Sequence, residues 1–114
     1  MKYLCLVYSN ERELHSLPES PKDEECMAYA ESIQGSGRMI AAEALEAVQT
    51  ATTVRMRNGK VSITDGPFAE TKEQLAGFYL IDARDLNEAL QVAGNIPAAR
   101  VGCVEVRPVR QLNP

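Results

Sequence analysis

The pair Asn58-Gly59 lies between two short segments in which apolar and polar residues alternate, residues 53–57 and 60–64. Asn-Gly favours a two-residue type I′ turn, because both central residues of that turn need a positive φ. A loop of this length fixes the register of the two strands and puts their large apolar side chains on one face. The sequence therefore predicts a β-hairpin with one half-buried face. The predicted pairs are Arg57 with Lys60, Met56 with Val61, and Val54 with Ile63.

Four further segments are predicted strands. Residues 3–8 and 77–81 are almost continuously apolar, which is typical of short strands covered on both faces. Residues 104–109 alternate, and their apolar positions are Val104 and Val106. Residues 39–45 are rich in Ala, Glu and Leu, which favour a helix by propensity, yet they follow a glycine stop. We interpret this segment as a strand.

Two helices are predicted from their capping signals, and residues 9–19 between the first strand and the first helix are predicted to be a loop. Ser20 can cap the first helix, Pro21 suits its first position, and the acidic residues 23–25 favour the positive end of its dipole. Asp85 and Glu88 have capping-box spacing for the second helix. The expected core residues are Cys26, Met27, Ala30 and Ile33 in the first helix, which ends at Gly35 and Gly37, and Leu86, Ala89, Leu90 and Ala93 in the second.

The order β-α-β-hairpin-β-α-β predicts an α+β fold, a ferredoxin-like split βαβ sandwich with an inserted β-hairpin. The first and last strands are neighbours in that topology, and the helices cover one face of the sheet. The other face is apolar and needs a partner, so we expect a homodimer that pairs as a dimeric α+β barrel. With 114 residues, the whole chain 1–114 is expected to form a single domain.

Composition excludes several function classes. The formal net charge is -4, and a nucleic-acid binder would show a basic face. No apolar stretch approaches the length of a membrane span, and the run 3–8 is too short for an export signal, so we expect a cytoplasmic protein. Cys5, Cys26 and Cys103 are far apart, which argues against a zinc site and favours inert core thiols. We expect no metal and no cofactor.

The string TDGPFAETKEQLAGFY at residues 64–79 resembles the signature of the DGPF-type branch of the YCII-related family. Residues 50–55, 95–100 and 104–108 also resemble family sequence. The resemblance implies a ferredoxin-like subunit of a dimeric α+β barrel. It further implies a small-molecule ligand, and an association of some relatives with extracytoplasmic-function sigma factors. In the wider family a His and an Asp form a proposed acid/base pair, and one relative eliminates chloride from a chlorinated hydroxyquinol.

Three residues are candidate proton carriers: Asp65, Glu43 and His15. Asp65 ends a predicted strand, where its carboxylate could take a ligand proton or simply cap the turn. Glu43 lies in an apolar strand and becomes an acid/base group only if it points into the barrel, since desolvation there raises a carboxyl pKa. His15 is the sole histidine and lies in the segment that resembles the family least, so the family's histidine role is not transferred to it.

Four residues are predicted to bind the ligand: Phe68, Glu70, Lys72 and Tyr79. Phe68 either lines a pocket or anchors its loop in the core. The charges at Glu70 and Lys72 either face a ligand or form a solvated loop surface, and loops carry function more often than cores. Arg55 and Arg57 share one strand face that either holds an anion or faces solvent.

Two functions compete at this point. The first is a homodimeric small-molecule binding protein with proton-transfer activity of the lyase or isomerase kind. The second is a non-catalytic ligand-binding or regulatory module associated with a sigma factor. An oxygenase of the kind found on this barrel rests on fold analogy alone.

Overall fold

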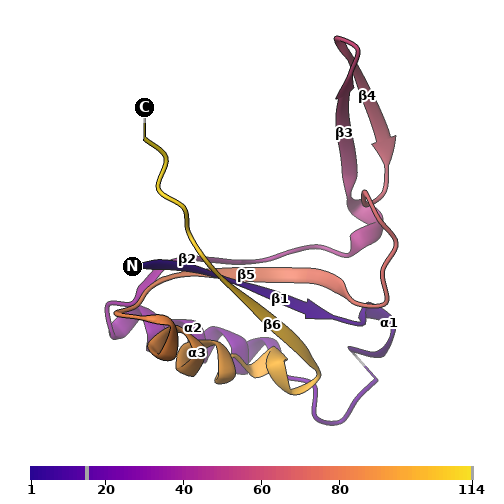
Figure 1. The fold of residues 1–114 in the computed structure, drawn as a ribbon. Coiled ribbons are helices and arrows are strands. Elements are labelled where there is room, and N and C mark those ends of the chain that lie inside the picture. The colour runs from indigo at the N-terminus through magenta and orange to yellow at the C-terminus, as the bar shows by residue number, and fades with distance from the viewer. Residues whose placement is uncertain (15, 114) are drawn as a thin grey trace.

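The computed structural model describes residues 1–14 and 16–113 and has a ferredoxin-like α+β architecture (Figure 1). Its main sheet has four antiparallel strands in the order β2-β5-β1-β6, and β3 and β4 form a separate hairpin. The first strand, β1, pairs with the last strand, β6, so this prediction is confirmed. In chain order the elements are β1 (Lys2–Ser9), α1 (Glu11–Leu14), α2 (Asp23–Gly35), β2 (Met39–Ala44), the 3₁₀ turn η1 (Val48–Thr50), β3 (Thr52–Arg57), β4 (Lys60–Asp65), β5 (Gln74–Asp82), α3 (Leu86–Gly94), the 3₁₀ turn η2 (Pro97–Arg100) and β6 (Gly102–Pro108).

Helices α2 and α3 cover one face of the sheet and leave the other face open (Figure 1). Alternate residues of the central strand β1, Tyr3, Cys5 and Val7, are buried on the helix side. Ile81 of β5 and Val92 of α3 complete this core. The intervening residues of β1 lie on the open face, where Leu4 pairs with Leu80 and Leu6 with Phe78. The sheet is therefore apolar on both faces, as the continuous runs predicted.

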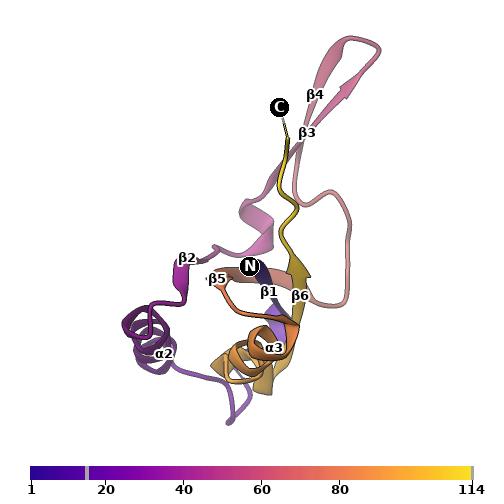
Figure 2. The same cartoon turned by 60° about the vertical axis from the view of Figure 1, so that its left-hand side comes forward.

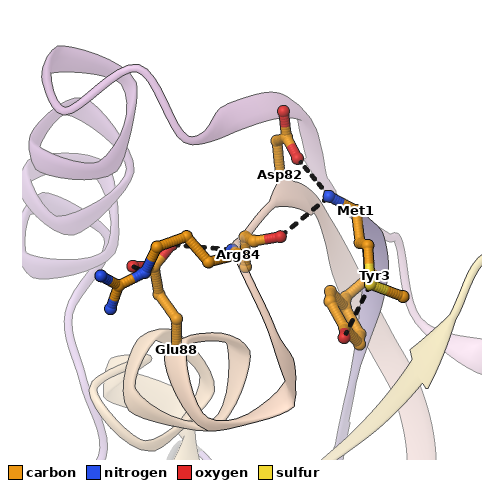
Figure 3. A network of polar contacts seen from close by, with 6 residues as sticks. Met1, Tyr3, Asp82, Arg84 and Glu88 are labelled. Carbon is orange, nitrogen blue, oxygen red and sulfur yellow. Dashed lines mark hydrogen bonds and ion pairs between the residues drawn. The ribbon is translucent and has the colours of Figure 1, made fainter.

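The start of the chain is tied to the segment between β5 and α3 (Figure 3). The Met1 amino group donates to Asp82 Oδ1 and to the carbonyl of Ala83, each at 2.9 Å. Asp85 caps α3 as predicted, accepting the Glu88 amide at 3.0 Å. The return bond differs from a capping box, because Glu88 accepts the amide of Arg84, one residue before the cap.

The predicted start of α2 is wrong. The helix begins at Asp23 after Lys22, which makes no side-chain cap, and the Ser20 hydroxyl instead donates to the carbonyl of Leu14. The expected core face is also rotated: Met27 is 63% exposed, and Tyr29 packs inward. The Tyr29 hydroxyl reaches across to the Val92 carbonyl at 2.6 Å, and this contact between the two helices sets their orientation.

The core stripe of α3 is rotated in the same way. Ala89 and Ala93 are buried as predicted, but Val92 joins them while Leu86 and Leu90 are exposed. Residues 11–14 form the short helix α1, where the sequence predicted a loop. The Asn10 side chain accepts the Arg12 amide at 3.0 Å, a local bond that favours this helical turn.

The β3–β4 hairpin, residues 52–65, is called the arm below, and it rises from the sheet on the side away from the helices (Figures 1 and 2). Its predicted register is confirmed pair by pair, and Asn58 and Gly59 both have positive φ. The expected burial is wrong for the single chain, since all four large apolar side chains of the arm are more than half exposed. The arm projects beyond the sheet, and none of the residues that the structure describes covers that face.

The cysteines divide by environment. Cys5 is buried, and burial raises the pKa of its thiol to about 11. Cys103 is exposed, so the expectation of an inert core thiol is wrong at that position. Within the described residues, none of the helices is both long enough and apolar enough to cross a membrane.

Gly102 gives a direct test of the β1–β6 packing. A Cβ at residue 102 would lie 2.0 Å from the Tyr8 carbonyl oxygen, so the backbones of the two strands would have to separate. Gly102→Ala is expected to lower the free energy of unfolding by about 1–3 kcal/mol. The matched control is Gly35→Ala, which meets no atom within 4 Å and is expected to be neutral or stabilising. Equal urea midpoints for the two variants would contradict this packing.

The Glu25–Arg100 ion pair predicts a pH dependence. Two hydrogen bonds of 2.6 and 2.8 Å join the side chains, and the Arg100 bond holds the pKa of Glu25 below its ordinary value. A lowered folded-state pKa gives stability that is present above the unfolded pKa, about 4.3, and is lost as pH falls through the folded value. Glu25→Gln should therefore reduce stability at neutral pH but not in strong acid. Glu24→Gln, at an exposed position of the same helix, serves as the control, and a difference that persists in acid would contradict the assignment.

Candidate functional site

An open cleft of about 580 Å³ is lined by residues from the base of the arm, the end of β1 and the start of β5. It is formed by α1, the turn η1 and the loop between β4 and β5. This loop, residues 66–73, is called the signature loop below, because it carries the central part of the signature string. The lining residues are Asn10, Glu11, Arg12, Val48, Gln49, Pro67, Ala69, Glu70, Thr71, Lys72 and Gln74.

Two side chains bind the three segments of the cleft together. Gln74 Oε1 accepts the backbone amide of Glu11 at 3.0 Å, and the Gln74 amide group donates to the Thr71 carbonyl at 2.7 Å. Glu11 Oε1 accepts the backbone amide of Val48 at 2.8 Å. The Gln74–Glu11 bond joins the loop to α1, and the Glu11–Val48 bond joins α1 to η1, so the walls of the cleft are held in place before any ligand arrives.

The Gly66-Pro67 step turns the chain from the arm into the cleft. Gly66 has a φ of 98°, a region that glycine adopts without strain. Its amide donates to the Ala51 carbonyl at 2.7 Å, and its carbonyl accepts the Thr53 hydroxyl at 2.8 Å. The turn is thus closed by backbone and Thr53, and Asp65 makes no side-chain hydrogen bond with any described residue.

Charges of both signs line the cleft. Arg12 and Lys72 are basic, and Glu11 and Glu70 are acidic. Glu11 already accepts a backbone amide, while the other three are exposed side chains. Such a lining can hold a polar ligand by charge-assisted hydrogen bonds. The described residues contain no cluster of three His, Cys, Asp or Glu side chains arranged for a metal.

Of the predicted ligand-binding residues, the cleft includes Glu70 and Lys72. Phe68 lies in the same loop but is 80% exposed and does not line the cleft. Tyr79 lies on the helix side of β5, where its ring packs edge-on against the ring of Tyr29, and the two ring centroids are 6.2 Å apart. Burial is the main cause that raises the pKa of Tyr79, with a smaller contribution from Cys26.

The predicted proton carriers are spread over different parts of the molecule. Asp65 ends β4 at the base of the arm and is exposed. Glu43 lies in β2 opposite Phe78, on the open face of the sheet, and is also exposed. Neither lines the cleft, and His15 lies outside the described residues. Arg55 and Arg57 share the polar face of the arm, where Arg57 donates to its neighbouring carbonyl of Met56.

The sequence interpretation missed the contribution of residues 10–12 to the cleft. These residues follow β1 directly and were assigned to a loop. The available signal was Asn10, a residue type that often caps a helix start. That signal indicates a helical turn. The position of this turn beside the signature loop, however, depends on the pairing of β1 with β5.

A second hollow, of about 410 Å³, lies between α2 and α3 and is more open than the cleft. Its lining includes Tyr29, whose hydroxyl is already bonded to the Val92 carbonyl. Arg38 is the charged residue among those that line it. The cleft at the signature loop offers more ligand-binding groups.

The fold and the loop at its cleft define a YCII-type protein. The model of the YCII-related domain matches residues 1–113, and the chain belongs to this family. An uncharacterised protein of Rhizobium meliloti is 38% identical over 120 residues, covering 100% of this chain and 96% of its own length.

A solved structure shares the fold. It is the 5-chloro-2-hydroxyhydroquinone dehydrochlorinase of Burkholderia phenoliruptrix AC1100 in complex with 2,5-dihydroxybenzoquinone. The two chains superpose with a TM-score of 0.56 over 96% of this chain and 94% of the other, at 14% identity. At that identity the likeness shows the fold alone.

Glu11 tests how the cleft is assembled. Glu11→Ala removes the acceptor of the Val48 amide and is expected to cost about 1–2 kcal/mol of unfolding free energy. Glu11→Gln keeps an oxygen at the same place and should lose less than half as much. Hydrogen exchange at the Val48 amide should accelerate in the Ala variant only. Equal exchange in both variants would show that the bond does not hold η1.

Proposed function

We propose that this protein binds a small polar organic molecule in the cleft formed by α1, η1 and the signature loop. The observation that carries the proposal is the hydrogen-bonded assembly of these three segments around a space of about 580 Å³. Small-molecule sites in proteins are typically preformed clefts of about 300–1,000 Å³. The family string therefore has a clear physical use, because residues 67–74 build one wall.

The lining favours a ligand that carries acidic hydroxyl or carbonyl oxygens. Lys72 and Arg12 can donate to such oxygens, and Glu70 can accept a hydroxyl proton. The ligand of the structurally similar dehydrochlorinase, 2,5-dihydroxybenzoquinone, belongs to this chemical class. A flat ring with oxygens at its edge is thus a reasonable probe for this cleft.

The finer form of the proposal is proton-transfer catalysis of the lyase or isomerase kind. A carboxylate beside a bound hydroxyl can act as a general base, provided that it lies within hydrogen-bond reach of the proton. Glu70 lines the cleft, whereas Asp65 and Glu43 reach a ligand only if an assembly of subunits brings them to one. The alternative is binding without turnover, as a regulatory module associated with extracytoplasmic-function sigma factors.

Calorimetric titration with 2,5-dihydroxybenzoquinone tests the binding site. Lys72→Ala is expected to weaken binding about tenfold, because a charge-assisted hydrogen bond contributes roughly 1.5 kcal/mol. The control is Lys22→Ala, which removes an exposed lysine before α2 and should leave affinity unchanged. Equal losses in both variants, or undiminished binding in Lys72→Ala, would refute this site.

Chloride release from 5-chloro-2-hydroxyhydroquinone tests the catalytic form separately. If Glu70 is the general base, Glu70→Gln should reduce the rate at least a hundredfold, within the usual range for such a group. Asp65→Asn and Glu43→Gln report on the two carboxylates outside the cleft. Binding of the quinone without chloride release would support the cleft and reject this activity.

A further inference from the structure

We propose that the ring of Phe68 turns onto the mouth of the cleft and stacks on the flat ring of a bound ligand, so that the site favours planar ring compounds. This inference rests on the proposed function, because it adds a contact to the face of a ligand whose edge is held by the polar lining. It is carried by the exposure of Phe68, by its place between two cleft residues and by the freedom of the segment around it.

Phe68 is the most exposed of the large apolar side chains that the structure describes, with 80% of its surface accessible. It adds nothing to the hydrophobic core, which lies between the sheet and the helices. A single exposed apolar side chain is common on protein surfaces. The position of this one is specific, however, because it lies in the loop that builds a wall of the cleft.

Phe68 lies at the rim of the cleft. The residues before and after it, Pro67 and Ala69, both line the cleft, and consecutive Cα atoms are only about 3.8 Å apart. Rotation about the Cα–Cβ bond of Phe68 changes the direction of its ring and moves neither lining residue. Exposed side chains exchange rotamers within nanoseconds, so the ring turns from solvent to the opening without a rearrangement of the backbone.

The segment that carries Phe68 is fixed at both ends and free between them. Gly66 is held at the base of the arm by two hydrogen bonds of 2.7 and 2.8 Å. The Thr71 carbonyl accepts the Gln74 amide group at 2.7 Å. Residues 67–70 are all exposed and make no hydrogen bond with any described residue. Figure 2 shows this part of the chain as an open loop beside the sheet.

The cleft has groups for the edge of a ligand but no aromatic surface for its face. Charged side chains such as Lys72 and Glu70 bind oxygens at the edge. None of the described residues that line the cleft is aromatic. Phe68 supplies that surface from the rim. Aromatic rings pair in offset-stacked or edge-to-face arrangements, and such pairing favours a planar ring over a saturated acid with the same oxygens.

The same movement covers the opening of the cleft. Glu70 lies two residues after Phe68 in the loop and lines the cleft. A ring over the opening excludes water from the ligand, and charge interactions are stronger where water is excluded. Phe68 therefore affects binding and proton transfer, although it does not line the open cleft.

Calorimetric titration with 2,5-dihydroxybenzoquinone tests the contact. Phe68→Ala is expected to weaken binding about tenfold, because both the apolar contact and the ring pairing are lost. Phe68→Tyr keeps the ring and should retain the wild-type affinity, whereas Phe68→Leu keeps an apolar side chain without a ring and should not. Met27→Ala is the control, since it removes another exposed apolar side chain, on α2. All these variants should unfold at the wild-type urea midpoint.

Fluorescence tests the movement of the ring. The chain contains no tryptophan, so Phe68→Trp supplies a single fluorescent probe, and Met27→Trp is its control on α2. Without ligand, acrylamide should quench the two variants equally. At saturating quinone, the Phe68→Trp indole should become less accessible to acrylamide, by roughly threefold, as expected for a ring that stacks on the ligand. The accessibility of the Met27→Trp indole should not change.

The outcomes separate this inference from the proposed function. Quinone binding that is lost in Lys72→Ala but unchanged in Phe68→Ala would keep the cleft and overturn the stacking contact. Full affinity in Phe68→Leu would overturn it as well. So would an indole in Phe68→Trp that is already shielded without ligand, because another surface would then cover residue 68. A wild type that does not bind the quinone would refute the proposed function, and this inference with it.

Discussion

Strand β1 holds this structure together, because it pairs with β5 on one side and with β6 on the other. Its alternate residues Tyr3, Cys5 and Val7 form the centre of the helix-side core. Gly102 permits the close approach of β6, since any side chain there would meet the Tyr8 carbonyl. With both neighbours fixed, the ends of three strands that are distant in sequence are fixed as well.

The position of the cleft follows from this pairing. Ser9, the last residue of β1, is opposite Gln74, the first residue of β5. The segment that follows β1 and the loop that precedes β5 must therefore lie side by side at one end of the sheet. The register between β1 and β5 shifts by one residue between Val7 and Tyr8, and this shift places Ser9 opposite Gln74. Gln74 then joins the two segments directly through its bond to the Glu11 amide.

The sequence was sufficient wherever local chemistry decides the outcome. Asn58-Gly59 determines the arm's register, and the carboxylate of Asp85 determines the start of α3. It was insufficient where two distant elements meet. The rotation of α2 depends on the bond from Tyr29 to Val92, so Met27 was wrongly assigned to the core. Similarly, Glu70 and Lys72 were predicted from the signature string, but Glu11 and Arg12 become cleft residues only through strand pairing.

The signature string serves two surfaces rather than one. Asp65 belongs to the face of the arm, while Glu70 and Lys72 line the cleft, and the positive φ of Gly66 separates the two directions. Stability within a single chain explains neither end of the string, because these charged side chains are exposed there. The turn at Gly66 therefore sets both the direction of the arm and the position of the cleft wall, and a side chain at its φ of 98° would strain both.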